Sequence, residues 1–295
     1  MNWRKTLGIK RNQPLKNKTS FRIGGRAAFF SSPSSLSQLR GIVIWAAKKK
    51  IPILMIGAGT NLLISDKGIK GLVIRLSAPC FKEVHQRLSL IEAGSGITLS
   101  SLIRLAGKMS LSGLEFLSGV PGTLGGALAM NAGCWGKEIS NLVEEIEVMD
   151  YKGEVRRISR EDVGFKYRES GLGNYIILKA RLKLKKGKLE TINKRIKDFI
   201  LKKRKSQDMR FYNAGCIFKN TKLAPAGKLI DMCGLKGLSL GDAFISDKHA
   251  NFILNRGDAK SSDVLKLIRL MRRSVKKKFG LILSPEIKIA GEKYV

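Results

Sequence analysis

GLEFLSGVPGTLGGALAMNAGCWG, residues 113–136, holds five glycines and a proline between Gly119 and Gly133 and almost no charge. Glycine permits positive φ and lets the backbone approach a ligand without an intervening Cβ. The stretch therefore predicts a turn at the start of a helix, with amide N–H groups that point outward toward an anion. The residues that form this predicted site are Pro121, Gly122, Gly125 and Gly126, with the side-chain amide of Asn131 nearby. A glycine-rich contact between core helices is the alternative.

The length and charge of the chain limit the classes of protein to consider. Its 295 residues exceed a typical single domain, so two domains are expected, and 43% hydrophobic residues allow a sizeable core. With 56 Lys+Arg against 23 Asp+Glu, the net charge of +33 suits nucleic acid, a membrane surface or small polyanions. Because the basic residues are spread over the whole chain, they favour a solvated basic surface. A basic nucleic-acid-binding protein is the alternative from another class.

The cysteines and histidines predict no metal site. The four cysteines contain no CxxC pair, and the two histidines lie far from them in the sequence, so neither zinc nor a disulfide framework is indicated. These residues are Cys80, Cys134, Cys216, Cys233, His85 and His249. The N-terminus lacks an apolar signal segment, and no apolar run approaches the roughly 18 residues of a membrane span, so we expect a cytoplasmic protein without membrane insertion.

A second glycine turn lies in the first third of the chain. Residues 1–18 are basic without apolar periodicity and are expected to form a surface arm. The apolar strand Ile53–Ile56, of a type usually buried on both faces, runs directly into GAGTN at Gly57–Asn61. This turn is not the dinucleotide fingerprint, since Leu62 replaces its last glycine, and the sequence contains no Walker GK[ST] pattern.

The middle of the chain predicts further strands that complete a first domain. We expect a strand at Leu88–Ala93, a helix at Ser100–Lys108, and a hairpin formed by Ile146–Met149 and Val155–Ile158. From Leu178 to Leu184, apolar residues alternate with Lys and Arg, which predicts a strand with one buried and one basic face.

Three helices are predicted in the segment after Gly187. Its first helix ends in the basic cluster Lys202–Lys205, which we interpret as a solvated helix end because no aromatic residues are interleaved with it, as a nucleic-acid patch would require. A second helix has Pro225 in its first turn and Gly234 after its end. The last helix places apolar residues inward and lysines and arginines outward.

Several separated motifs together resemble the UDP-N-acetylenolpyruvoylglucosamine reductase family, and they occur in the family's order from Asn17 to Gly291. They are NKTSFRIGGRA (17–27), GAGTNLLISDKGIKGLVI (57–74), GLEFLSGVPGTLGGALAMNAG (113–133), GFKYRES (164–170), AGCIFKN (214–220), AGKLID (226–231), SDKHANFILN (246–255) and PEIKIAG (285–291). Each motif is weak alone, but their shared order and spacing are specific.

The resemblance implies an α+β protein with the FAD-binding fold of the vanillyl-alcohol-oxidase (PCMH-type) class and a C-terminal α+β substrate-binding domain. Residues 19–187 would form the FAD-binding domain, with two subdomains, and 188–295 the C-terminal domain, in the more compact of the family's two types. The FAD pyrophosphate would lie along Gly57, Ala58, Gly59, Thr60 and Asn61, and along Pro121, Gly122, Thr123, Gly125, Gly126 and Asn131. Neither loop contains histidine, so non-covalent FAD is expected.

The activity that the resemblance implies is NADPH-dependent reduction of the enolpyruvyl group of UDP-N-acetylglucosamine enolpyruvate to UDP-N-acetylmuramate, in peptidoglycan synthesis. Arg168 would hold the substrate carboxylate with its planar fork. Cys216 stands where the family most often has a serine proton donor, and Glu286 would assist near the enolate. Tyr167, Lys219 and Asn220 would contact the substrate. A monomer is expected.

Other interpretations of these residues stay open at this point. Arg168 could pair with a surface carboxylate, Cys216 could be a small buried apolar residue, and Glu286 could pair with a lysine. A second enzymatic hypothesis is another FAD-dependent oxidase or dehydrogenase of the same fold, which the motifs AGCIFKN and PEIKIAG disfavour.

Overall fold

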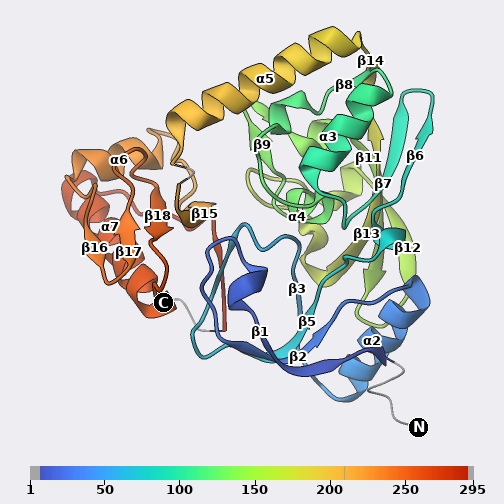
Figure 1. The fold of residues 1–295 in the computed structure, drawn as a ribbon, viewed down its shortest axis with the longest axis horizontal. Coiled ribbons are helices and arrows are strands. Elements are labelled where there is room, and N and C mark those ends of the chain that lie inside the picture. The colour runs from blue at the N-terminus through green and yellow to red at the C-terminus, as the bar shows by residue number, and fades with distance from the viewer. Residues whose placement is uncertain (1–6, 209, 292–295) are drawn as a thin grey trace. The chain divides into compact units, whose positions relative to one another are not determined.

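The computed structural model (Figure 1) describes residues 7–208 and 210–291, which divide into two compact units. Of these residues, unit 1 contains 7–11, 29–58 and 71–203, and unit 2 contains 12–28, 59–70, 204–208 and 210–291. Two early segments therefore group with the C-terminal part of the chain. The domain limits expected at residues 18 and 187 stay a prediction.

Unit 1 is built on a five-stranded antiparallel sheet in the order β12-β11-β13-β7-β6. Its strands are β6 (Val84–Arg87), β7 (Leu90–Gly94), β11 (Val143–Asp150), β12 (Val155–Ser159) and β13 (Tyr175–Lys183). The predicted hairpin and the predicted alternating strand are confirmed as β11–β12 and β13, whereas β6 was not predicted. Helix α4 (Leu124–Ala129) contacts β13 and β7, so the glycine-rich stretch lies beside this sheet.

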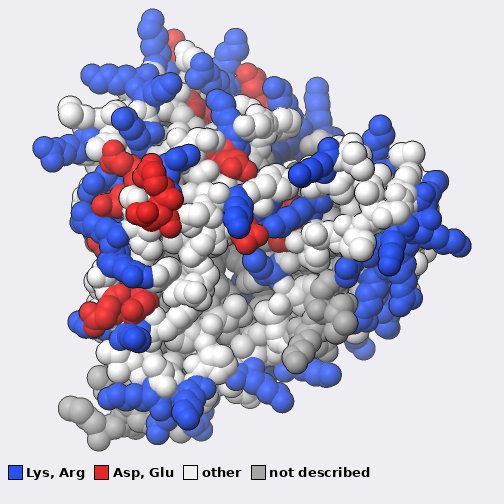
Figure 2. Space-filling view, turned by 180° about the vertical axis from the view of Figure 1, so that it is seen from behind, with Lys and Arg blue, Asp and Glu red and all other residues white. Residues whose placement is uncertain are grey.

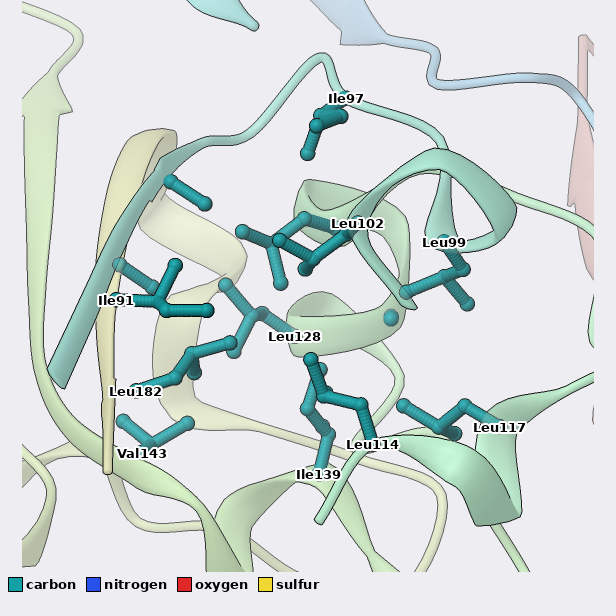
Figure 3. Close-up of a cluster of buried hydrophobic side chains, with 14 of the residues drawn as sticks. Ile91, Ile97, Leu99, Leu102, Leu114, Leu117, Leu128, Ile139, Val143 and Leu182 are labelled. Carbon is teal, nitrogen blue, oxygen red and sulfur yellow. The ribbon is translucent and has the colours of Figure 1, made fainter. Parts of the chain in front are cut away.

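The hydrophobic core of unit 1 lies between this sheet and the helices α3 (Leu99–Lys108) and α4. Figure 3 shows how side chains from separate elements converge there, with Leu102 of α3, Leu128 of α4 and Leu182 of β13 among them. All three side chains are completely buried. Burial of a leucine side chain contributes about 1.5–3 kcal/mol, so these contacts fix the position of the loop between α3 and α4.

The opposite face of the sheet carries a ladder of ion pairs. The Nζ atom of Lys179 lies 3.0 Å from Glu92 and 3.5 Å from Glu147, and Arg181 lies 3.6 Å from Glu145. The hydrogen bond from Lys179 lowers the pKa of Glu92. The basic face that the alternation predicted is confirmed, and carboxylates of the neighbouring strands balance its charge.

A second sheet has the order β1-β2-β5-β3. Its strands are β1 (Lys10–Pro14), β2 (Arg26–Ser31), β3 (Ile53–Met55) and β5 (Ile69–Ile74), and helix α2 (Leu36–Lys48) belongs to unit 1. The surface arm expected at residues 1–18 stays a prediction: Lys10–Pro14 pairs as a mostly exposed strand, and residues 1–6 lie outside the described part. Full burial of the strand before the GAGTN turn is also wrong, because β3 is an edge strand and is only partly buried.

Unit 2 contains the antiparallel sheet β15-β18-β17-β16 and the parallel pair β19–β4. The strands are β4 (Leu62–Ile64), β15 (Tyr212–Cys216), β16 (Ser239–Leu240), β17 (Ala243–Ile245), β18 (Phe252–Asn255) and β19 (Lys288–Ala290). The helices α6 (Ala226–Met232) and α7 (Ser261–Phe279) confirm the two predicted helices. Their apolar faces share one core with Phe21, Phe218 and Leu63.

The remaining elements of unit 1 are two short strand pairs and one long, polar helix. They are β8 (Leu111–Ser112) with β14 (Lys185–Lys186), β9 (Gly133–Cys134) with β10 (Lys137–Glu138), and α5 (Leu189–Ser206), which continues past the limit of unit 1 at residue 203. Ile192 is the one buried residue among those described in α5, so the helix is mainly solvated. Figure 2 shows Lys and Arg side chains spread over the visible face, as a solvated basic surface predicts. None of the described helices combines the length and apolar character needed to span a membrane.

Candidate functional site

The two glycine loops meet in unit 1, where Gly57 lies against Thr123. A side chain at residue 57 would place its Cβ 2.5 Å from Oγ1 of Thr123, so only glycine permits this approach. The same Oγ1 accepts a hydrogen bond of 3.3 Å from the amide of Gly126 and caps α4. Gly57, the first residue of GAGTN, thus lies against the residue that caps α4.

The turn before α4 offers fewer outward amides than the sequence predicts. The amide of Gly125 donates to the carbonyl of Ser95 at 2.8 Å, and that of Gly126 donates to Thr123. The prediction of outward N–H groups at these two glycines is therefore wrong, because they fasten α4 to the rest of unit 1. The amides of Gly122 and Thr123 donate to no described residue, which leaves these two to bind an anion.

The rest of the GAGTN loop, residues 59–61, belongs to unit 2. The carbonyl of Gly59 accepts a hydrogen bond of 3.1 Å from the amide of Ser20, and the hydroxyl of Ser20 donates to the carbonyl of Asn213 at 2.7 Å. The side-chain amide of Asn61 donates to the carbonyl of Glu286 at 3.1 Å. Asn61 therefore joins the predicted cofactor loop to one of the predicted catalytic residues.

The structure brings Cys216 and Glu286 onto neighbouring backbone segments of unit 2. The amide of Glu286 donates to the carbonyl of Ile217 at 2.8 Å, and Phe218 pairs with Pro285 in an isolated β-bridge. Both predicted catalytic side chains are partly exposed. A thiol and a carboxylate thus belong to adjoining backbone segments, and their catalytic roles stay a prediction.

The predicted substrate residues Lys219 and Asn220 follow directly on the same segment. The amide of Lys219 donates to the carbonyl of Ser284 at 2.9 Å, which extends the pairing that holds Glu286. The side-chain oxygen of Asn220 accepts a hydrogen bond of 3.0 Å from the amide of Ala226 at the start of α6. Asn220 therefore has a structural contact that the motif did not predict.

Tyr167 and Arg168 occupy the middle of a tight turn in unit 1. Lys166 and Glu169 exchange backbone hydrogen bonds of 3.0 and 3.1 Å, and Arg168 has a φ of +56°. A positive φ at the second central residue is the pattern of a type II turn, which usually takes glycine there. The guanidinium carbon lies 5.1 Å from the ring centre of Tyr167, a residue that is 46% exposed.

The side chain of Arg168 is anchored to the end of the glycine-rich stretch. Its Nη2 donates to the carbonyl of Gly133 at 2.8 Å. Arginine keeps its charge at all accessible pH values and presents several donors in one plane, so a group held in this way suits a carboxylate ligand. Arg168 belongs to unit 1, whereas Cys216 and Glu286 belong to unit 2.

The side chain of Asn131 is 1% exposed and is hydrogen-bonded within the protein. Its Nδ2 donates to Oε2 of Glu138 at 2.8 Å and to the carbonyl of Lys166 at 3.0 Å, and its Oδ1 accepts from the amide of Ser140 at 3.2 Å. These contacts use both donor hydrogens. The cofactor role predicted for Asn131 stays a prediction, and its contacts favour a structural role.

Three residues with clear contacts in these loops were not predicted. Ser20 holds Gly59, the carbonyl of Gly133 holds Arg168, and Ser170 donates to the carbonyl of Ala129 at 3.0 Å. Ser170 is the last residue of the GFKYRES motif, so the motif itself could have drawn attention to it. The described residues contain no group of three or more His, Cys, Asp or Glu side chains arranged to hold a metal ion.

Comparison with known proteins assigns both parts of the chain. Residues 27–159 match the FAD binding domain family. Residues 207–290 match the family described as UDP-N-acetylenolpyruvoylglucosamine reductase, C-terminal domain.

Full-length relatives carry the same name. The UDP-N-acetylenolpyruvoylglucosamine reductase of Caldanaerobacter subterraneus subsp. tengcongensis is 42% identical over 96% of this chain and 93% of its own, and that of Clostridioides difficile is 41% identical over 96% and 94%. The crystal structure of the enzyme from Thermus caldophilus superposes with a TM-score of 0.83 at 35% identity and covers 96% of this chain and 98% of that one. The predicted α+β fold, with an FAD-binding part and a C-terminal domain, is confirmed.

Proposed function

The chain belongs to the UDP-N-acetylenolpyruvoylglucosamine reductase family, and from this membership we propose that it reduces the enolpyruvyl group of UDP-N-acetylglucosamine enolpyruvate with NADPH. The product would be UDP-N-acetylmuramate for peptidoglycan synthesis. The protein is an FAD-containing oxidoreductase of this family, and FAD supplies the hydride-carrying chemistry when it is bound. A cytoplasmic location and a monomeric state belong to the same proposal.

The residues of the two glycine loops fit a diphosphate. Gly57 has no room for a side chain beside Thr123, and the amides of Gly122 and Thr123 remain available for hydrogen bonds. Consecutive backbone amides form concave sites that suit anions. Gly57 and Ala58 in unit 1, and Gly59, Thr60 and Asn61 in unit 2, would complete the loop around the cofactor.

Arg168 would bind the carboxylate of the enolpyruvyl group. Reduction at C3 places negative charge on C2, beside this carboxylate, so a fixed cation there stabilises the transition state more than the ground state. The anchored guanidinium meets this need, because it is held by Gly133 before the substrate arrives. Tyr167, whose ring lies beside the guanidinium, would contact the same part of the substrate.

Cys216 would deliver the proton to C2, with Glu286 as the second polar group. A free thiol is a stronger acid than an alcohol and is mainly protonated near neutral pH, so cysteine can replace serine as a proton donor. The observation that carries this assignment is the backbone pairing of Glu286 with Ile217, which brings the carboxylate to the segment of the thiol. Lys219 and Asn220, on the same segment, would contact the substrate.

The test is spectroscopic. The purified protein should be yellow, release FAD on denaturation and lose its flavin absorbance when NADPH is added without oxygen. The enolpyruvyl sugar nucleotide should then restore the absorbance, whereas a flavin oxidase of the same fold would respond mainly to oxygen. A colourless protein that takes up no added FAD would refute the proposal, and colourless protein that binds nucleic acid in a salt-dependent manner would favour the other class.

A further inference from the structure

Three hydrogen bonds fasten the turn that carries Arg168 to the segment after α4. Ser170 donates to the carbonyl of Ala129, Asn131 donates to the carbonyl of Lys166, and Arg168 donates to the carbonyl of Gly133. Their lengths are 3.0, 3.0 and 2.8 Å. All three bonds connect the short segment 129–133 with the turn 166–170, so together they restrain the turn against this segment.

Arg168 needs such support because of its own backbone. A φ of +56° is a conformation that residues other than glycine rarely adopt, and it persists where the surroundings impose it. The turn itself supplies two backbone bonds between Lys166 and Glu169. The three bonds to segment 129–133 therefore restrain a turn in which Arg168 has an unfavourable positive φ.

The three bonds are donated by the side chains of Ser170, Asn131 and Arg168, and of these three residues Asn131 is the buried one. The orientation of its side chain is fixed from two sides. Its Oδ1 accepts from the amide of Ser140, and its second hydrogen is directed at the carboxylate of Glu138. The amide of Glu138 in turn donates to the side chain of Asn141 at 2.9 Å. The Nδ2 group is thus held in place for Lys166 by contacts that do not involve the turn.

We propose that Asn131 is a positioning residue for Arg168, which acts by holding the carbonyl of Lys166. The inference rests on the proposed function, in which Arg168 binds the substrate carboxylate. Thr123 caps the start of α4, and Asn131 lies two residues after its end at Ala129. The stretch that would present amides to the cofactor would therefore also position Arg168, the residue proposed to bind the substrate carboxylate. A displacement of about 1 Å in a positioned group can lower a rate by roughly a factor of 10².

Two substitutions of Asn131 separate hydrogen bonding from packing. Asn131→Asp retains the shape but removes both donors and brings a second carboxylate to Glu138, whereas Asn131→Ala removes the side chain. In both variants, reoxidation of the reduced enzyme by the enolpyruvyl substrate should slow about 10-fold to 100-fold, while reduction by NADPH and the FAD content stay near wild type. Substrate affinity, measured by titration of the flavin absorbance, should fall in parallel.

A readout without cofactor or substrate is hydrogen exchange of the turn. The amides of Lys166 and Glu169 should exchange faster in Asn131→Ala than in the wild type, because loss of the restraint lets the turn open. Ser170→Ala, which removes one exposed bond of the same set, should give the same effects more weakly and keeps the proposal testable if the Asn131 variants fail to fold.

The matched control is Asn255 in unit 2. Its side chain is 0% exposed and also has three bonds, one to the carbonyl of Phe21 and two from the amides of Gly257 and Ala259. Asn255→Ala should lose stability without changing the ratio of the two half-reactions or the exchange of the turn. Unchanged exchange and kinetics in Asn131→Ala, or equal slowing of both half-reactions with loss of FAD, would overturn the proposal. Failure of the wild type to respond to the enolpyruvyl substrate would instead refute the proposed function.

Discussion

The carboxylate of Asp66 caps helix α7 through Ser261, a residue 195 positions later in the chain. Its Oδ1 accepts a hydrogen bond of 3.1 Å from the amide of Ser261, and its Oδ2 accepts one of 2.9 Å from the hydroxyl. The residue at the cap position of α7, Lys260, makes no capping bond with its side chain. The cap is therefore supplied by the turn between β4 and β5.

Removal of this cap should destabilise unit 2. We expect Asp66→Ala to lower the free energy of unfolding by about 1–2 kcal/mol, because loss of a capping side chain leaves helix amides unsatisfied. Asp162 is the control, since it accepts a bond of 2.7 Å from Ser159 in an exposed local turn. Asp162→Ala should cost less than about 0.5 kcal/mol. Urea unfolding followed by circular dichroism measures both, and equal losses would contradict the assignment of the cap.

The proposed binding of the substrate carboxylate by Arg168 can be tested with Arg168→Lys. Lysine keeps the charge but cannot form the planar two-point contact, so reoxidation by the enolpyruvyl substrate should slow by about 10²-fold while reduction by NADPH is nearly unchanged. Stopped-flow absorbance separates the two steps. Arg156 is a matched control, because its guanidinium lies 4.5 Å from the ring of Tyr175 in a similar pairing. Arg156→Lys should change neither step, and equal slowing of both steps in Arg168→Lys would indicate a folding or cofactor defect.

The thiol of Cys216 can be tested by two replacements. Cys216→Ser should keep substantial activity, whereas Cys216→Ala should slow flavin reoxidation by substrate about 10²-fold to 10⁴-fold, the usual effect of removing a positioned acid. Substrate should also protect the wild type from alkylation at this residue, which mass spectrometry can locate. Cys80, which is exposed, provides the reference for unprotected alkylation. Wild-type turnover in Cys216→Ala would make Glu286 or an ordered water the leading candidate for the acid.

Burial of His249 should make stability depend on pH. Burial lowers the pKa of this imidazole, and the nearby charge of Lys236 acts in the same direction. Below pH of about 6.5 the unfolded chain binds a proton that the folded protein does not, so stability falls as pH falls, by at most about 1.4 kcal/mol per unit. Above that pH both states are neutral at this residue and the contribution is constant.

The slope, measured by urea unfolding between pH 7.5 and 5, identifies the residue. His249→Asn retains an acceptor for the amide of Asn251, which donates to Nδ1 at 3.2 Å, and should flatten the slope even if stability is lower throughout. The exposed His85 is the control. If His85→Gln flattened the slope and His249→Asn did not, the assignment would be wrong.

Local patterns in the sequence predicted several of the longer strands and helices. Pro225 stands directly before α6, and Gly234, with a φ of +70°, follows its end, as the sequence predicts. The alternation along β13 predicted its buried face because one sheet face packs on the core. The cofactor and the candidate catalytic residues were predicted from the family resemblance, which rests on the order of the motifs.

Contacts between distant segments account for what the sequence could not predict. The outward amides expected at Gly125 and Gly126 are occupied by Ser95 and Thr123, which no local pattern indicates. The strand Lys10–Pro14 lacks apolar residues and exists because β2 offers it a partner. Asn131 donates a hydrogen bond to Lys166, 35 residues away. Local sequence does not indicate this contact, and a polar residue in a glycine-rich stretch therefore predicts a ligand contact instead.

The three bonds between segments 129–133 and 166–170 depend on the spacing of residues along the chain as well as on side-chain identity. A substitution in either segment removes at most one of the three bonds, but insertion of a single residue between Ala129 and Gly133 would change the spacing of the bonded positions, so that the three bonds could not all keep their present geometry. Related sequences should consequently vary in composition here while conserving the spacing, and gaps in an alignment should fall outside these two segments.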